Sequence, residues 1–192
     1  MTTLTAESVL EFWFTELTPE QWFRGGETVD HLVKQRYETL LEEVRDGQHD
    51  SWAESPEGRL ALILVLDQFP RNIYRGTERS FAYDAKALQL ALKGIEEGDD
   101  LKLGHDHRAF FYLPLEHSES LEIQDQSVER YASLVLSVPP EQRDSVRHYL
   151  DFAWKHYVII KQFGRYPHRN AILERASSAE ESAFLEGPNS SF

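Results

Sequence analysis

The feature that most constrains the fold is an unbroken apolar run from Leu60 to Leu66, within the stretch LALILVLDQF. Ser55 followed by Pro56 is a typical helix start, with a capping side chain and then a proline at the first helical position. A helix without a polar face has to lie at the centre of a core. We therefore expect a helix from about Pro56 to Phe69 that is more buried than any other.

Helical periodicity also dominates the rest of the chain, and strand signals are nearly absent. The expected helices cover residues 29–47, 81–98, a segment ended or kinked near Leu113 by Pro114, about 120–139, 146–164, and a last helix announced by the capping-box pair Ser177 and Glu180. The connections between them are short. The sequence thus predicts an all-α fold of antiparallel helix pairs in a single domain, residues 1–192.

Composition excludes several classes of protein. The chain has no cysteine, which rules out disulfides and thiolate chemistry and favours the cytoplasm. No apolar stretch approaches the roughly 20 residues that cross a bilayer, and the N-terminal MTTLTAESVLEFWF lacks the basic region of an export signal, so we expect neither export nor membrane insertion. A net charge of −13 argues against nucleic acid as a partner.

Two segments are positive against this acidic background. Residues 155–175 contain five basic residues and one acid, a charge of +4, and residues 69–79 contain three basic residues and one acid, a charge of +2. The remainder therefore carries −13 − 6 = −19. Such local concentrations of positive charge are candidates for binding a small anion.

The same two segments carry similar motifs, QFPRN at residues 68–72 and QFGRYPHRN at residues 162–170. In both, we expect the proline to stop the preceding helix and to leave backbone amides free at the next turn, where anions bind. Arginine side chains beside those amides suit carboxylate or phosphate recognition. The alternative is structural: the arginines pair with carboxylates of the fold, and the asparagines cap loops. In particular, we expect Asp67 and Arg71, four residues apart, to be partners.

A third polar segment is EHSE, at residues 116–119. A histidine flanked by acids can act as a general base, or can form a metal site together with His156 and His168. The spacing matches no established metal motif, so we assign no metal and no cofactor. His156 falls on the apolar side of its helix, where a histidine either hydrogen-bonds a neighbour or contacts a ligand.

Aromatic residues cluster near the N-terminus as FWF, Phe12 to Phe14, and as WF, Trp22 and Phe23. Such clusters usually belong to the core, and the alternative is a stacking platform for a planar ligand. The sequence contains no glycine-rich phosphate loop, no Gly-x-Ser-x-Gly motif and no dinucleotide fingerprint. No reaction class follows from the residue pattern, and no catalytic residue is assigned.

The blocks LALILVLDQFPRNIYRG, FAYDAKAL, FFYLPLEHSE and FGRYPHRNAIL, with the N-terminal VLEFWF, resemble the bacterial domain-of-unknown-function family 924. The similarity spans nearly the whole chain. It implies an all-helical, tetratricopeptide-like superhelix with one domain per chain. It implies no reaction, ligand or catalytic residue.

The sequence favours a protein that binds a small anionic or amide-bearing molecule or peptide, with enzyme activity and oligomeric state left open. The candidate ligand-binding residues are Asp67, Gln68, Arg71, Asn72, Glu116, His117, Glu119, His156, Arg165, His168, Arg169 and Asn170. We expect the two Arg-Asn segments to meet in space. The alternative is a tetratricopeptide-like scaffold whose concave surface binds a partner protein or peptide.

Overall fold

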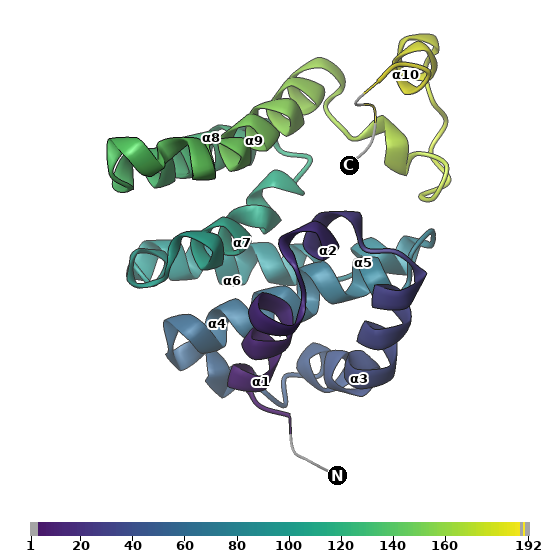
Figure 1. Ribbon diagram of the computed structural model, residues 1–192. Coiled ribbons are helices and arrows are strands. Elements are labelled where there is room, and N and C mark those ends of the chain that lie inside the picture. Colours follow the sequence, from purple (N-terminus) through teal and green to yellow (C-terminus); the bar gives the residue numbers. More distant parts are fainter. Residues whose placement is uncertain (1–3, 189, 191–192) are drawn as a thin grey trace. The chain divides into compact units, whose positions relative to one another are not determined.

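The protein is all-α. The computed structural model describes residues 4–188 and 190, and within these residues every regular segment is helical and no strand occurs (Figure 1). The α-helices are α1 Ala6–Glu11, α2 Pro19–Arg24, α3 Glu27–Arg45, α4 Pro56–Ile63, α5 Phe69–Ile73, α6 Asp84–Glu97, α7 His105–Glu116, α8 Leu121–Ser137, α9 Arg143–Phe163 and α10 Ala179–Leu185. Two π-helical segments, η1 Phe12–Glu16 and η3 Leu64–Gln68, and five 3₁₀ turns, η2 Asp50–Glu54, η4 Glu78–Phe81, η5 Asp100–Lys102, η6 Pro140–Gln142 and η7 Pro167–Arg169, complete the described elements.

The contacts within the chain divide it into two compact units, which we describe separately. The N-terminal unit comprises the described residues up to Arg75 together with Arg79–Pro114, and the C-terminal unit comprises Gly76–Glu78 and the described residues from Leu115 onward. The boundary in α7 falls at Pro114, where a kink or helix end was expected. The helix nevertheless continues to Glu116. The expectation of a single domain stays a prediction.

The apolar run forms the centre of the N-terminal unit, as expected. Side chains from Leu60 to Leu66 are at most 2% exposed. Helix α4 and segment η3 contact α1, α3 and α6, which surround them. The rings of Phe12, Trp13, Tyr37 and Phe69 pack beside this run, with Tyr37 and Phe69 centroids 4.8 Å apart. The interpretation of Phe12 and Trp13 as core residues is correct, because both are buried.

Pro70 does not stop its helix, which corrects the expectation from the sequence. The chain stays helical from Pro56 through η3 and α5 to Ile73. The π-helical turn before Pro70 is closed by the Phe69 N–H donating to the Leu64 carbonyl, and this wider turn makes room for the proline ring. The amides after Pro70 therefore belong to a continuing helix.

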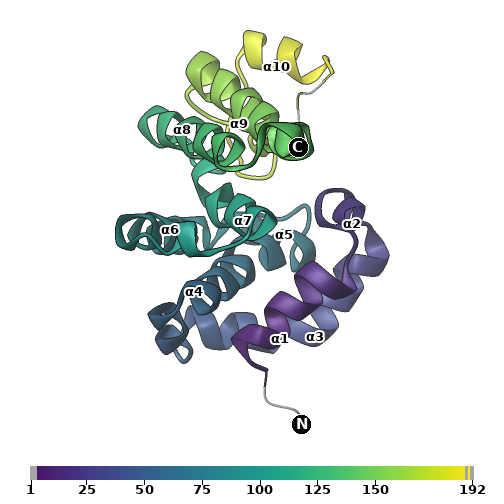
Figure 2. The same ribbon diagram turned by 60° about the vertical axis from the view of Figure 1, so that its left-hand side comes forward.

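The C-terminal unit is built on a helical hairpin of α8 and α9, which lie side by side in Figures 1 and 2. Tyr131 of α8 stacks on Tyr149 of α9, with ring centroids 6.4 Å apart. Helix α9 ends at Gly164, which adopts the left-handed conformation at φ 69°, as expected from the glycine. Pro167 therefore follows the helix end and does not cause it, which is the second correction to the proline interpretation.

The last helix begins one residue later than the capping pair Ser177 and Glu180 predicted. Ser178 caps α10 by accepting from the Glu181 N–H, and the Glu181 carboxylate accepts from the Ser178 N–H. The sequence SSAEE offers the same spacing in two registers. The observed register frees Ser177 to accept a hydrogen bond from Asn170 at 3.1 Å.

No helix in the described part of the chain has both the length and the apolar character to cross a membrane. The cytoplasmic location and the tetratricopeptide-like superhelix stay predictions.

Candidate functional site

The QFPRN segment lies on the central helix of the N-terminal unit, and the carboxylate that precedes it is fully buried. Asp67 has no exposed surface. Its Oδ2 accepts from the Gln68 amide at 2.6 Å, and its Oδ1 lies 3.4 Å from the Arg71 guanidinium. Arg71 also donates to the Asp67 backbone carbonyl at 2.6 Å. The predicted partnership of Asp67 and Arg71 is therefore confirmed.

Acids that are distant in sequence offset the positive charge of this segment. Arg71 donates to both carboxylate oxygens of Asp84, at 2.8 and 2.9 Å. Arg75 and Asn72 both donate to Asp30 of α3. These bonds join α5 to α3 and α6. In the N-terminal unit, the segment thus has a clear structural role.

In the C-terminal unit, Arg165 and Arg175 each form a bidentate pair with one carboxylate, as Arg71 does with Asp84. Arg165 donates to Glu181 at 2.6 and 2.8 Å, and this bond holds the pKa of Glu181 down at about 2. Arg175 donates to Glu119 at 2.7 and 2.9 Å. Burial raises the pKa of Glu119, but the bonds from Arg175 and the Tyr166 N–H outweigh it, so this pKa lies below its usual range.

Asn170 forms hydrogen bonds that stabilise the loop in which these arginines lie. Its amide donates to Ser177, and its carbonyl oxygen accepts from Arg175 at 3.0 Å. The turn itself is closed by backbone bonds from the Arg169 N–H to Tyr166 and from the Asn170 N–H to Pro167. The residue thus caps a loop, as the structural alternative for the asparagines predicted.

Tyr166, which has no exposed surface, is the centre of the polar cluster in this unit. Its hydroxyl donates to the Glu116 backbone carbonyl and accepts from the Gln124 amide at 2.9 Å. Burial raises the pKa of this phenol far above its usual value. On the ring face lies the guanidinium of Arg169, with its carbon 4.5 Å from the ring centroid. Arg169 is itself 7% exposed.

His156 lies beside the same ring and is buried against Glu116. Its Nδ1 lies 2.8 Å from the Phe152 carbonyl and 3.1 Å from the Glu116 carboxylate. Since both neighbours are acceptors, Nδ1 carries the proton and donates. Burial lowers the pKa of His156 to about 3, so the imidazole is neutral at pH 7 and Nε2 is an acceptor.

His168 and His117 complete the cluster. The His168 ring lies 5.5 Å from the Tyr166 ring, and the His117 ring lies 6.3 Å from that of His156. Burial, with the positive charge of Arg169, lowers the pKa of His168 to about 4. The described residues contain no group of three or more His, Cys, Asp or Glu side chains placed to hold a metal ion.

The structure thus brings Glu116, His117, His156, His168 and Arg169 together around Tyr166. Glu119, Arg165 and Asn170 support the adjoining loop. Tyr166 and Gln124 were not among the residues predicted from the sequence, because a buried aromatic residue and a glutamine in the first turn of a helix give no local signal. Asp67, Gln68, Arg71 and Asn72 belong to the other unit, and the meeting of the two Arg-Asn segments stays a prediction, as does their part in ligand binding.

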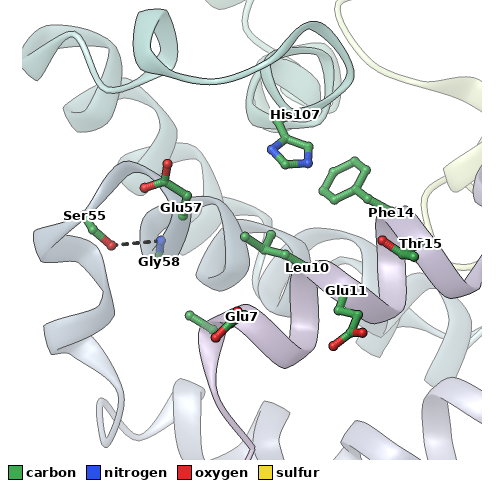
Figure 3. Close-up of a pocket in the computed structure, with 10 residues that line it drawn as sticks. Glu7, Leu10, Glu11, Phe14, Thr15, Ser55, Glu57, Gly58 and His107 are labelled. Atoms are coloured by element: carbon green, nitrogen blue, oxygen red, sulfur yellow. Dashed lines mark hydrogen bonds between the residues drawn. The ribbon is translucent and has the colours of Figure 1, made fainter.

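The chain also contains a cavity of about 660 Å³, and none of the candidate residues lines it. It lies within the N-terminal unit, between α1 with η1, the start of α4, and α7 (Figure 3). The lining residues are Ala6, Glu7, Leu10, Glu11, Phe14, Thr15, Ser55, Glu57, Gly58 and His107. Phe14 belongs to the FWF cluster, for which a stacking platform was the alternative to a core role. His107 lies in the first turn of α7.

The chemistry of this cavity differs from that of the Tyr166 cluster. Its lining includes three glutamates and neither lysine nor arginine. The rings of Phe14 and His107 lie 4.2 Å apart, and Figure 3 shows them together on one side. Burial lowers the pKa of His107, so its ring is neutral at pH 7. Such a lining suits a cation and disfavours an anion.

Comparison with known proteins agrees with the fold. The model of the family described as bacterial protein of unknown function (DUF924) matches residues 9–189. The chain belongs to this family. No curated protein matches the sequence. Among solved structures, the chain is similar to a protein of unknown function, ATU0120, from Agrobacterium tumefaciens, with 35% identity, a TM-score of 0.85, and coverage of 95% of this chain and 97% of that one.

The DUF924 match places both polar regions inside the family domain. It includes every candidate residue around Tyr166 and the whole QFPRN segment. It also includes the cavity lining apart from Ala6 and Glu7, which precede it. Both polar regions therefore lie within the part of the chain that the family model matches.

Proposed function

We propose that the chain binds a small anionic molecule in its C-terminal unit, through Arg169. The observation that carries this proposal is the position of the Arg169 guanidinium over the buried Tyr166 ring, with its carbon 4.5 Å from the ring centroid. Arg165 and Arg175 use their N–H edges to bind Glu181 and Glu119. The Arg169 guanidinium lies over the Tyr166 ring and adds a positive charge beside His156 and His168. The edges of a guanidinium are the part that recognises carboxylate and phosphate groups.

The neighbours of Arg169 support the same chemistry. His168 and His156 are neutral at pH 7 because burial lowers their pKa values. A neutral imidazole offers one donor and one acceptor, which suits the hydroxyl or amide groups of an anionic metabolite. The arrangement supplies one fixed positive charge with adaptable hydrogen-bonding groups beside it. We assign no reaction to it.

A thermal-shift panel of phosphate and of mono-, di- and tricarboxylates tests the proposal. A ligand present at 100 times its Kd adds about 2.7 kcal/mol to the free energy of unfolding. We expect Arg169→Gln to reduce the shift to about half or less, while Arg147→Gln, which removes an exposed positive charge from the same unit, keeps it. Sodium chloride at the same ionic strength controls for general salt effects. An Arg169→Gln protein that responds like the wild type contradicts the proposal.

A second candidate function is favoured by the cavity of the N-terminal unit. Its glutamates and its aromatic pair suit an organic amine, whose charge would lie over Phe14 and His107. The same panel, extended with primary and quaternary amines, tests this candidate. Glu11→Gln should weaken the amine response, and Glu129→Gln on α8 should not. Because Glu11 and Arg169 lie in different units, the two candidates fail independently. The scaffold alternative stays a prediction.

A further inference from the structure

Helix α9 has apolar side chains on two faces. One face is buried in the C-terminal unit and includes Val146, Tyr149 and Ala153. The other lies in solvent, where Trp154 is 47% exposed and Val158 is 55% exposed. A helix in a soluble unit normally presents polar residues on its outer face. Exposed large apolar side chains that adjoin one another indicate a contact surface.

Opposite charges bound this exposed pair. Asp151 precedes Trp154 by three residues, and Lys161 follows Val158 by three residues. With the four-residue step between Trp154 and Val158, the spacing places all four side chains along one stripe of the helix. Asp151 and Lys161 are both exposed. Neither forms an ion pair with another residue in the part of the chain that the structure describes.

The stripe is complementary to itself when two copies run antiparallel. The midpoint between Trp154 and Val158 along α9 is also the midpoint between Asp151 and Lys161. A twofold axis through that midpoint places Trp154 against Val158 of the second copy, and Asp151 against Lys161 of the second copy, each twice. A C₂ interface requires this reciprocity. A parallel arrangement would instead oppose like charges.

We propose that the chain forms a homodimer in which the exposed stripes of two α9 helices pack antiparallel. The next positions outward, Arg147 and Arg165, would carry like charges. Arg165, however, lies beyond the helix end at Gly164 and is bound to Glu181. Arg147 lies 3.6 Å from Asp144. Their repulsion is therefore offset within each copy.

Sedimentation equilibrium over about a hundredfold range of protein concentration tests the dimer, because association follows mass action. The wild type should show twice the mass of the chain at high concentration. Asp151→Lys and Lys161→Asp each turn two attractive contacts into repulsive ones, so either change should raise the dimer dissociation constant by about tenfold or more. Asp125→Lys, the same charge change on the exposed surface of α8, should leave it unaltered. Circular dichroism checks that each variant is folded.

Mixing the two variants makes the test specific. In the mixture, the lysine introduced by Asp151→Lys faces the aspartate introduced by Lys161→Asp. The two proteins should therefore form a heterodimer with a lower dissociation constant than the homodimer of either variant. The double variant Asp151→Lys with Lys161→Asp should likewise regain the wild-type mass. A wild type that is monomeric at every concentration overturns the proposal. So does a dimer that survives Asp151→Lys, or a mixture that does not associate.

Discussion

Asp67 is a carboxylate with no exposed surface, held by Gln68 and Arg71. Asp67→Ala removes the acceptor of the Gln68 amide and one partner of Arg71, while Arg71 keeps Asp84. We expect the free energy of unfolding to fall by about 2 kcal/mol, since buried polar groups lose their hydrogen bonds. Urea denaturation measures the loss. Asp125→Ala on the surface of α8 should change stability by less than about 0.5 kcal/mol. Equal stability of the two variants would remove Asp67 from the core network.

His156 and His168 make the stability of the C-terminal unit depend on pH. Their pKa values fall from 6.5 to about 3 and about 4 in the folded chain, because burial disfavours the imidazolium. Below pH 6.5 the unfolded chain binds these protons and the folded chain does not. The stabilisation is therefore complete above pH 6.5 and is lost as the pH falls toward 4. Each histidine contributes a slope of up to about 1.4 kcal/mol per pH unit.

Replacing His156 tests this dependence. His156→Gln removes one titrating group, so the stability of the variant should change less between pH 7 and pH 5 than that of the wild type. Urea midpoints at the two pH values give the comparison. His148→Gln, at an exposed position of α9, is the control and should keep the wild-type slope. A His156→Gln slope equal to that of the wild type would show that the buried imidazole is not the group that titrates.

Local spacing explains which residue contacts were predictable. The Asp67–Arg71 pair follows from four-residue spacing on one helix. The partners Asp84 and Glu181 lie 13 and 16 residues from their arginines, and Asp30 lies 45 residues from Arg75. Such pairs depend on how helices pack, which no local pattern specifies. The positive segments were therefore visible in the sequence, while the acids that offset them were not.

At the scale of elements, the central helix owes its position to an apolar surface on every side. Leu64 is 1% exposed and lies in the π-helical segment η3. Leu64→Ala should lower the free energy of unfolding by about 2 to 5 kcal/mol, because it leaves a cavity in the core. Leu136→Ala on α8, where the side chain is 68% exposed, is the matched control and should cost less than about 0.5 kcal/mol. Comparable losses in urea denaturation would refute the central placement.

Helix ends were predictable where a glycine can adopt the left-handed conformation that terminates a helix. Gly98 and Gly164 both take the left-handed conformation that ends α6 and α9. Proline was less informative, because Pro70 and Pro114 both lie inside continuing helices. The π-helical turn that accommodates Pro70 depends on packing around η3, and the sequence has no recognised signal for it. The capping register at α10 was ambiguous because two serines precede two glutamates at the same spacing.

At the scale of the whole molecule, the distribution of charge in the sequence suggested more anion-binding sites than the structure supports. The net charge of −13 and the two positive segments suggested anion sites at both Arg-Asn motifs. Carboxylates bind Arg71, Arg75, Arg165 and Arg175 in the folded units. The sequence therefore indicated the positive regions correctly, but most of their arginines form ion pairs that stabilise the fold. The cavity was not predicted, because its lining combines residues from three separate parts of the N-terminal unit.

The most direct test of the proposed function is isothermal titration calorimetry with the anion that stabilises the wild type most in the thermal-shift panel. Three proteins are compared at pH 7: the wild type, Arg169→Gln and Arg147→Gln. We predict saturable binding to one site per chain for the wild type and for Arg147→Gln, and a loss of affinity of about tenfold or more for Arg169→Gln, since a charge-assisted hydrogen bond is worth roughly 1.5 to 3 kcal/mol. Equal affinity of Arg169→Gln and the wild type would contradict anion binding at Arg169.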